Sequence, residues 1–89
     1  MIEEGGFAAE ETDMPHIIVK LAAGRTTDQK ARLAEALTQS LVAVLGCEEA
    51  AVSVGIEDVD PEAWFSQVYG PDIQEKQETI FKKPGYDPA

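Results

Sequence analysis

The sequence has little cysteine, histidine and positive charge. With one cysteine and one histidine in 89 residues, it can form neither an internal disulfide nor a zinc site with four cysteine or histidine ligands. Seven basic residues stand against 17 acidic ones, which gives a formal charge of −10 at pH 7. Nucleic-acid backbones and anionic membrane surfaces both attract clusters of Lys and Arg. We therefore expect no nucleic-acid partner, no membrane partner and no bound metal.

Long apolar runs and targeting signals are also missing. No stretch of the sequence approaches the roughly 20 apolar residues that a membrane-spanning helix needs. The N-terminus lacks the basic segment followed by an apolar segment that marks a secretory signal. A single thiol is typical of proteins in a reducing compartment. These absences predict a soluble, cytoplasmic protein.

The acidic charge is concentrated at the N-terminus. Residues 1–13 carry five carboxylates and no Lys or Arg, and the rest of the chain then holds twelve acidic and seven basic residues. This segment has a glycine pair and no sustained hydrophobic period, which predicts a flexible acidic leader. The composition changes at Met14. We therefore divide the chain into an N-terminal extension, residues 1–14, and one domain, residues 15–89.

Two segments of the domain have the pattern of β-strands. Residues 16–21 are rich in β-branched side chains, and residues 51–57 alternate in polarity. In the first segment Ile17 and Val19 share one face, while Ile18 makes the opposite face partly apolar too. A strand of this kind is expected to be covered on both faces.

A strong helix signal lies between the two strands. Thr26 and Gln29 form a capping-box pattern, and leucines at helical spacing follow it. Gly46 is a natural C-terminal stop, so we expect a helix over residues 27–45. Two strands joined by such a helix form a β-α-β unit with parallel strands and a right-handed crossover.

Shorter helices are expected after the second strand. Asp60 and Pro61 have the pattern of a helix N-cap followed by proline at the first helical position. We expect this helix to end by Gly70 and a further helix to begin at Pro71 and run to about residue 81. The fold class is therefore α+β: a β-α-β unit with short C-terminal helices.

A two-stranded sheet with one long helix leaves strand edges and one sheet face uncovered, and a chain of this length has a marginal core. We therefore expect an oligomer assembled through the sheets, most simply a homodimer, with a higher oligomer also possible.

Two local features allow a functional or a structural interpretation. Cys47 follows the long helix beside Glu48 and Glu49, whose charges disfavour a thiolate, so a structural thiol is the better interpretation. The acidic run at residues 57–60 could suggest a cation site. A solvated strand end followed by a helix N-cap explains this run more simply.

The chain also resembles a known family. The residues that carry the resemblance are Met14-Pro15-His16-Ile17-Ile18-Val19-Lys20, Gly24-Arg25-Thr26-Thr27-Asp28-Gln29-Lys30, Pro61-Glu62-Ala63-Trp64 and Lys82-Lys83-Pro84-Gly85-Tyr86. The first two segments resemble the opening of the 4-oxalocrotonate tautomerase family, whose mature chains begin with a catalytic proline. The last two are similar to the small dimeric bacterial tautomerases that act on phenylpyruvate-like compounds.

The resemblance implies a tautomerase that needs no cofactor. Pro15 matches the catalytic proline, whose amine acts as general acid and base; an apolar pocket lowers the pKa of such an amine below its usual 7.7–8.0. Arg25 matches the arginine that binds the substrate carboxylate, and Trp64 matches an aromatic wall of the pocket. Without the resemblance, these residues would be interpreted as a strand-start proline, a solvated turn residue and a core tryptophan.

Two departures from the family pattern refine the expectation. Ser53 stands where many members carry a second arginine on the second strand, which favours a monoacid such as an arylpyruvate as the substrate. Fourteen residues precede Pro15, and while the Met14–Pro15 peptide bond is intact the proline nitrogen is an amide without basicity. The alternative to an enzyme is therefore a non-catalytic oligomer of the same fold, or a carboxylate-binding protein.

Overall fold

The computed structural model describes residues 14–87, so the expected leader lies outside the described residues except for Met14. The strands are β1 (His16–Ala22) and β2 (Ser53–Val59), and the long helix is α2 (Thr27–Leu45). Shorter helical segments are η1 (Glu49–Ala51), η2 (Pro61–Ala63), η3 (Phe65–Gln74) and η4 (Gln77–Thr79). This order confirms the α+β class and the β-α-β unit.

The described chain divides into two compact units. The first contains the chain up to Val19 and Arg25–Glu57, and the second contains Lys20–Gly24 and the chain from Asp58. Buried apolar side chains are found in both: Cys47 in the first unit, and Val59 and Val68 in the second. No helix among the described residues has the length and apolar character needed to cross a bilayer.

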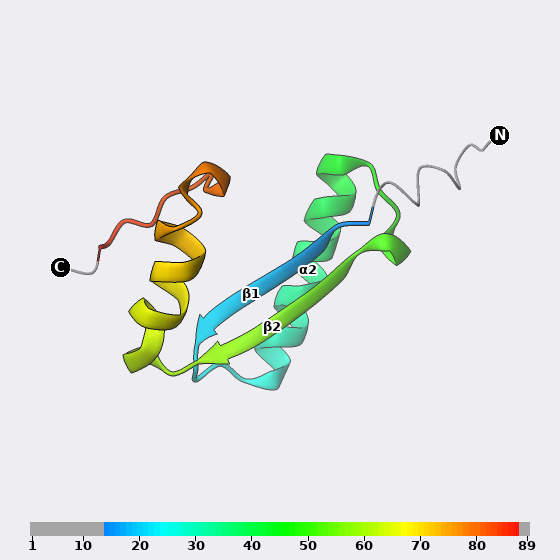
Figure 1. Ribbon diagram of the computed structural model, residues 1–89. Helices are drawn as coiled ribbons and strands as arrows, with labels where there is room; N and C mark the ends of the chain where they lie inside the picture. Colours follow the sequence, from blue (N-terminus) through cyan, green and yellow to red (C-terminus); the bar gives the residue numbers. More distant parts are fainter. Residues whose placement is uncertain (1–13, 88–89) are drawn as a thin grey trace. The chain divides into compact units, whose positions relative to one another are not determined.

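The strands β1 and β2 are neighbours in a two-stranded sheet, and Figure 1 shows that they run in the same direction. The Ser53 N–H donates to the Pro15 carbonyl over 3.2 Å, and the Ala23 N–H donates to the Val59 carbonyl over 2.8 Å. The first of these bonds sets His16 opposite Ser53 in a parallel ladder. The parallel arrangement is therefore the one expected for a β-α-β unit.

Strand β2 begins two residues later than the sequence pattern predicted. The correction comes from η1, where the Ala51 N–H donates to the Glu48 carbonyl over 3.0 Å and the Val52 N–H donates to the Glu49 carbonyl over 3.1 Å. These bonds close a tight turn, and a residue whose N–H closes a turn cannot use it in the ladder. The strand then continues to Val59 rather than ending at Glu57.

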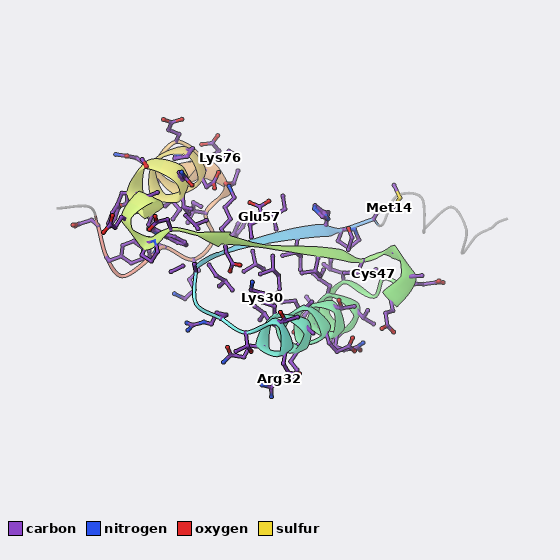
Figure 2. The ribbon with its side chains drawn as sticks, turned by 90° about the horizontal axis from the view of Figure 1, so that it is seen from below. Met14, Lys30, Arg32, Cys47, Glu57 and Lys76 are labelled. Carbon is purple, nitrogen blue, oxygen red and sulfur yellow. The ribbon has the colours of Figure 1, made fainter. Side chains whose placement is uncertain are left out.

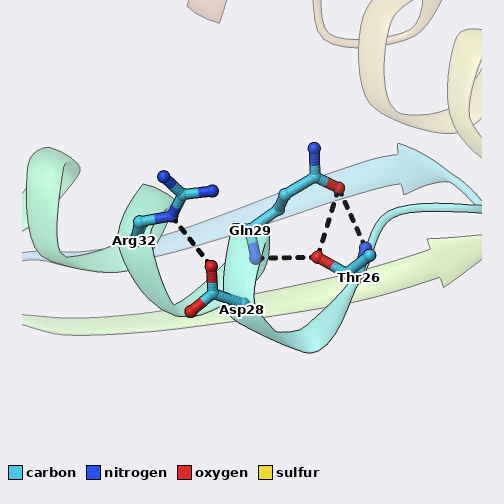
Figure 3. A network of polar contacts seen from close by, with 4 residues as sticks. All are labelled: Thr26, Asp28, Gln29 and Arg32. Carbon is cyan, nitrogen blue, oxygen red and sulfur yellow. Dashed lines mark hydrogen bonds and ion pairs between the residues drawn. The ribbon is translucent and has the colours of Figure 1, made fainter.

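Helix α2 lies on one side of the strands, with Arg32 on its outer surface (Figure 2). Its start has the expected capping box (Figure 3): the Gln29 N–H donates to Thr26 Oγ1, and the Thr26 N–H donates to Gln29 Oε1, each over 3.0 Å. Asp28 and Arg32 form an i,i+4 ion pair at 3.1 Å. The helix ends at Gly46, whose φ of 74° is left-handed and suits a residue without a Cβ.

The second unit differs from the sequence-based expectation. Asp60 caps η2 as expected, since its Oδ1 accepts from the Glu62 N–H over 3.0 Å. The expectation of one helix ending by Gly70 and another beginning at Pro71 is wrong, because η3 is a π-helix that runs through both residues. A proline ring clashes with the carbonyl four residues earlier in an α-helix. The wider π-helical turn gives the ring of Pro71 room, so the helix continues.

Candidate active site

Pro15 lies directly before β1 and is half-buried. Its carbonyl oxygen accepts the Ser53 N–H, so the ladder with β2 fixes its backbone. A hollow of about 260 Å³ is lined by Met14, Glu48, Ala50 and Ala51, and thus reaches the residue that precedes Pro15. In the 89-residue chain the nitrogen of Pro15 is bonded to Met14 and carries no proton.

A polar pair beside Pro15 was not foreseen from the sequence. His16 Nδ1 and Ser53 Oγ share a hydrogen bond of 2.6 Å, although the two residues are 37 positions apart. The strand register sets them opposite each other, on the sheet face that also carries the exposed Ile18. The alternation of polar and apolar residues in each strand can be read from the sequence, but the register between the two strands cannot. Ser53 therefore presents a hydroxyl that is already hydrogen-bonded.

Arg25 lies in the turn between β1 and α2. Gly24, with φ of 133°, makes the turn possible, since this region of φ favours glycine. Arg25 is exposed and directly precedes the N-cap residue Thr26. Within residues 14–87 the structure shows no hydrogen bond or ion pair of its guanidinium. The turn therefore presents a cation beside a helix N-terminus, where backbone N–H groups also favour an anion.

Pro15 and Arg25 are not brought together within one chain. Pro15 precedes β1 and Arg25 follows it by a short turn, and the strand has seven residues. At about 3.3 Å per residue, the strand separates the two by about 23 Å. One small molecule cannot contact both residues of the same chain.

Trp64 lies in the second unit, at the junction of η2 and η3. Its side chain is half-buried, and its Nε1–H donates to the Tyr86 hydroxyl oxygen over 3.0 Å. The rings of Phe65, Tyr69 and Tyr86 contact one another nearby. The group forms because the C-terminal tail folds back and places Tyr86 against Phe65 and Tyr69 of η3. No local pattern in the sequence indicates this contact.

The described residues offer no metal-binding group: among residues 14–87 no three His, Cys, Asp or Glu side chains gather closely enough to hold an ion. The groups that the structure does present are a cation at a helix start, an aromatic surface, and the proline position at the start of a strand. Taken separately, a cation at a helix start suits an organic anion, and an aromatic surface suits an apolar group.

Comparisons with known proteins identify relatives along most of the chain. The model of the tautomerase enzyme family matches residues 15–71. A "probable tautomerase" of Xylella fastidiosa is 51% identical over 73 residues, which cover 82% of this chain and 89% of that protein. The tautomerase PptA of Cronobacter sakazakii is 41% identical, over 83% of this chain and 99% of that protein. Among solved structures, TomN, a 4-oxalocrotonate tautomerase homologue of the tomaymycin biosynthetic pathway, superposes with a TM-score of 0.56 and 38% identity, over 73% of this chain and 97% of TomN.

Proposed function

The chain belongs to the tautomerase family, and from this premise we propose that it is an isomerase that interconverts the keto and enol forms of a small 2-oxo acid such as an arylpyruvate. The observation that carries the proposal is that the family match begins at Pro15 itself. Pro15 is also the residue at which the β-α-β unit begins. The reaction moves one proton within the substrate and requires no cofactor.

In the proposed mechanism the secondary amine of Pro15 acts as both base and acid. It removes a proton from one end of the enol system, and the protonated amine returns a proton to the other end, so the enzyme is regenerated. An amine does this efficiently when its pKa lies near the working pH. The rate should therefore fall as the pH drops below the pKa of the amine, because the protonated form cannot act as the base.

The substrate is held by its two chemically distinct ends. Arg25 pairs with the carboxylate through two parallel N–H···O bonds, and Trp64 offers an apolar face to the substituent. A single cationic side chain at this position suits a monoacid. Because Pro15 and Arg25 are about 23 Å apart along one chain, we propose a homodimer or higher oligomer in which different chains supply them. The single thiol supports a reducing, cytoplasmic location.

The leader supports a second candidate function. With residues 1–14 attached, the Pro15 nitrogen is an amide, so this form is better suited to binding a carboxylate than to catalysis. Removal of the segment, or synthesis from Met14 with trimming of that methionine, would release the amine. The chain would then change from a carboxylate-binding protein into an enzyme.

A side-by-side assay of both forms tests the proposal. Chains that begin at Pro15 should tautomerise an arylpyruvate, and the 89-residue chain should be slower by the contribution of the base, about 10²–10⁴-fold. Intact-mass measurement before and after the assay shows whether the leader is still attached. Equal rates with the leader in place would mean that Pro15 is not the base.

A further inference from the structure

The tryptophan of this chain is tied to the C-terminal tail. Trp64, the chain's one tryptophan, donates its indole N–H to Tyr86, 22 residues later. A half-buried indole generally finds a partner for its N–H because leaving this donor unpaired costs free energy. The hydrogen bond fixes the direction of the N–H and so restricts rotation of the indole about its side-chain bonds.

Tyr86 is itself held in place by two other rings. Its ring meets Phe65 edge-on, with centroids 6.1 Å apart and an interplanar angle of 79°. It meets Tyr69 at 5.8 Å and 48°, and Phe65 and Tyr69 are 5.4 Å apart. These separations lie in the favourable range for aromatic pairs. Tyr86 is 45% exposed, but its contacts with these two rings restrict the position of its ring and so of its hydroxyl.

We propose that Tyr86 is a positioning residue that holds the Trp64 indole in the orientation needed to receive an aromatic substituent of the substrate. This inference rests on the proposed function, in which Trp64 forms the apolar wall of the site. Aromatic rings attract one another most in offset or edge-to-face arrangements, so the orientation of the indole sets the affinity for an aryl group. An indole that is already fixed also loses less conformational freedom when the ligand binds.

The inference predicts a preference for aryl over aliphatic acids that depends on one hydroxyl. An aliphatic chain makes contacts with an aromatic face that depend less on ring orientation. Loss of the Tyr86 hydroxyl should therefore weaken the binding of an aryl acid and leave that of an aliphatic acid of similar size little changed. A purely structural role of Tyr86 would weaken both equally.

The experiment measures binding to the 89-residue chain, which requires no free amine at Pro15. The probe is 3-phenylpropanoate, which has a carboxylate and a phenyl ring but no 2-oxo group to react, and 4-methylpentanoate is the aliphatic counterpart. Isothermal titration calorimetry gives the Kd of each acid for the parent, Tyr86→Phe and Tyr69→Phe. Tyr69→Phe is the matched control because it removes a phenol hydroxyl from the same ring group without touching the bond to Trp64.

We expect Tyr86→Phe to raise the Kd of 3-phenylpropanoate about 2- to 10-fold, because the bond can favour the binding orientation of the indole by at most the contribution of one neutral hydrogen bond. The emission of Trp64 should shift in the same variant and not in Tyr69→Phe. In a Trp64→Phe background, which has no indole donor, Tyr86→Phe should change the Kd no further. Far-UV circular dichroism and the unfolding midpoint show that the variants are folded.

Two results would overturn the positioning role while leaving the proposed function intact. One is that Tyr86→Phe and Tyr69→Phe give the same Kd and the same emission. The other is that Tyr86→Phe weakens both acids to the same extent. Failure of the parent to bind 3-phenylpropanoate would contradict both the positioning role and the aryl-binding role of Trp64 on which it rests. If, in addition, chains beginning at Pro15 do not tautomerise an arylpyruvate, the proposed function itself is wrong.

Discussion

At the scale of single residues, Arg25 offers a direct test of substrate binding. It is exposed, and the described residues give its guanidinium no partner, so its removal should disturb the fold little. We expect Arg25→Ala to lower kcat/KM for an arylpyruvate about 10- to 100-fold, mainly through KM, because a hydrogen bond to a charged group contributes about 1.5–3 kcal/mol. The kcat/KM of Arg25→Lys should lie between those of the parent and Arg25→Ala, since an ammonium keeps the charge but cannot form the two parallel hydrogen bonds to a carboxylate. Steady-state kinetics of chains beginning at Pro15 measure both.

Arg32 provides the matched control for Arg25. It is an exposed arginine of the same chain whose guanidinium pairs with Asp28 on the outer surface of α2. Arg32→Ala should leave KM near that of the parent. If kcat/KM fell by a similar factor in Arg25→Ala and Arg32→Ala, positive charge in general would be what attracts the substrate. Arg25 would then have no specific role.

The residues that could be predicted from the sequence are those whose partners lie nearby in the chain. The Thr26–Gln29 capping box depends on a spacing of three residues, and it was predicted and is confirmed. The hydrogen bonds of His16 with Ser53 and of Trp64 with Tyr86 join residues 37 and 22 positions apart. Such partners depend on strand register and on how the tail folds, and local patterns contain neither. The proposed roles of Pro15, Arg25 and Trp64 came instead from a family resemblance.

At the scale of elements, the start of α2 is open to a stability test. Thr26→Ala removes the side-chain oxygen that accepts the Gln29 N–H and should lower the free energy of unfolding by about 1 kcal/mol. Thr27→Ala is the control, because Thr27 is the first helical residue and makes no cap bond. Urea denaturation at one fixed chain concentration gives both values. A loss in Thr27→Ala as large as that in Thr26→Ala would contradict the capping argument.

An ion pair joins the end of β1 to η3 and gives a second test at this scale. Lys20 Nζ lies 2.5 Å from Asp72 Oδ2, with both side chains largely shielded from solvent, whereas Lys76 Nζ is 4.0 Å from Asp72 Oδ1 and more exposed. We expect Lys20→Met to lower the free energy of unfolding by about 1 kcal/mol and Lys76→Met to change it little, because exposed pairs contribute little. If urea denaturation showed the same decrease in the free energy of unfolding for Lys20→Met and Lys76→Met, the closer contact of Lys20 with Asp72 would contribute no additional stability.

Helix η3 shows why element boundaries were predicted less well than element types. The pair Gly70-Pro71 normally marks the end of one helix and the start of another, and this pattern led to the wrong boundary. Glu75 donates its N–H to the Gly70 carbonyl over 3.0 Å, five residues earlier, which is the spacing of a π-helix. A Cβ at Gly70 would lie only 3.3 Å from the Phe65 carbonyl oxygen. The absence of a Cβ at Gly70 therefore allows the backbone at Phe65 to approach closely. The sequence pattern did not distinguish this role of glycine from that of a helix stop.

At the scale of the whole molecule, the exposed apolar surface predicts self-association. Large apolar side chains remain exposed on both strand and helix, among them Ile18 at 54% and Val44 at 80%, and α2 contains no buried residue. We expect sedimentation at micromolar concentration to show at least two chains per particle. Ile18→Glu should shift the particles toward single chains, because it places a charge on an exposed apolar position of β1, whereas Ala36→Glu on the exposed surface of α2 should not. A folded, stable parent monomer would contradict this expectation.

The proposed site makes a further demand on the assembly. If one small acid must contact Pro15 and Arg25, which lie at opposite ends of a seven-residue strand, then the two residues come from different chains. Mixed oligomers of Pro15→Ala and Arg25→Ala chains, each beginning at residue 15, then contain some sites with both native residues. In a dimer with two shared sites, each mixed particle has one fully native site and one with both residues replaced. We therefore expect mixing to raise kcat/KM above that of either parent, in proportion to the mixed particles, which native mass spectrometry counts. Subunit exchange without any recovered activity would mean that each chain uses its own residues, and the Arg25 assignment would then fail on distance alone.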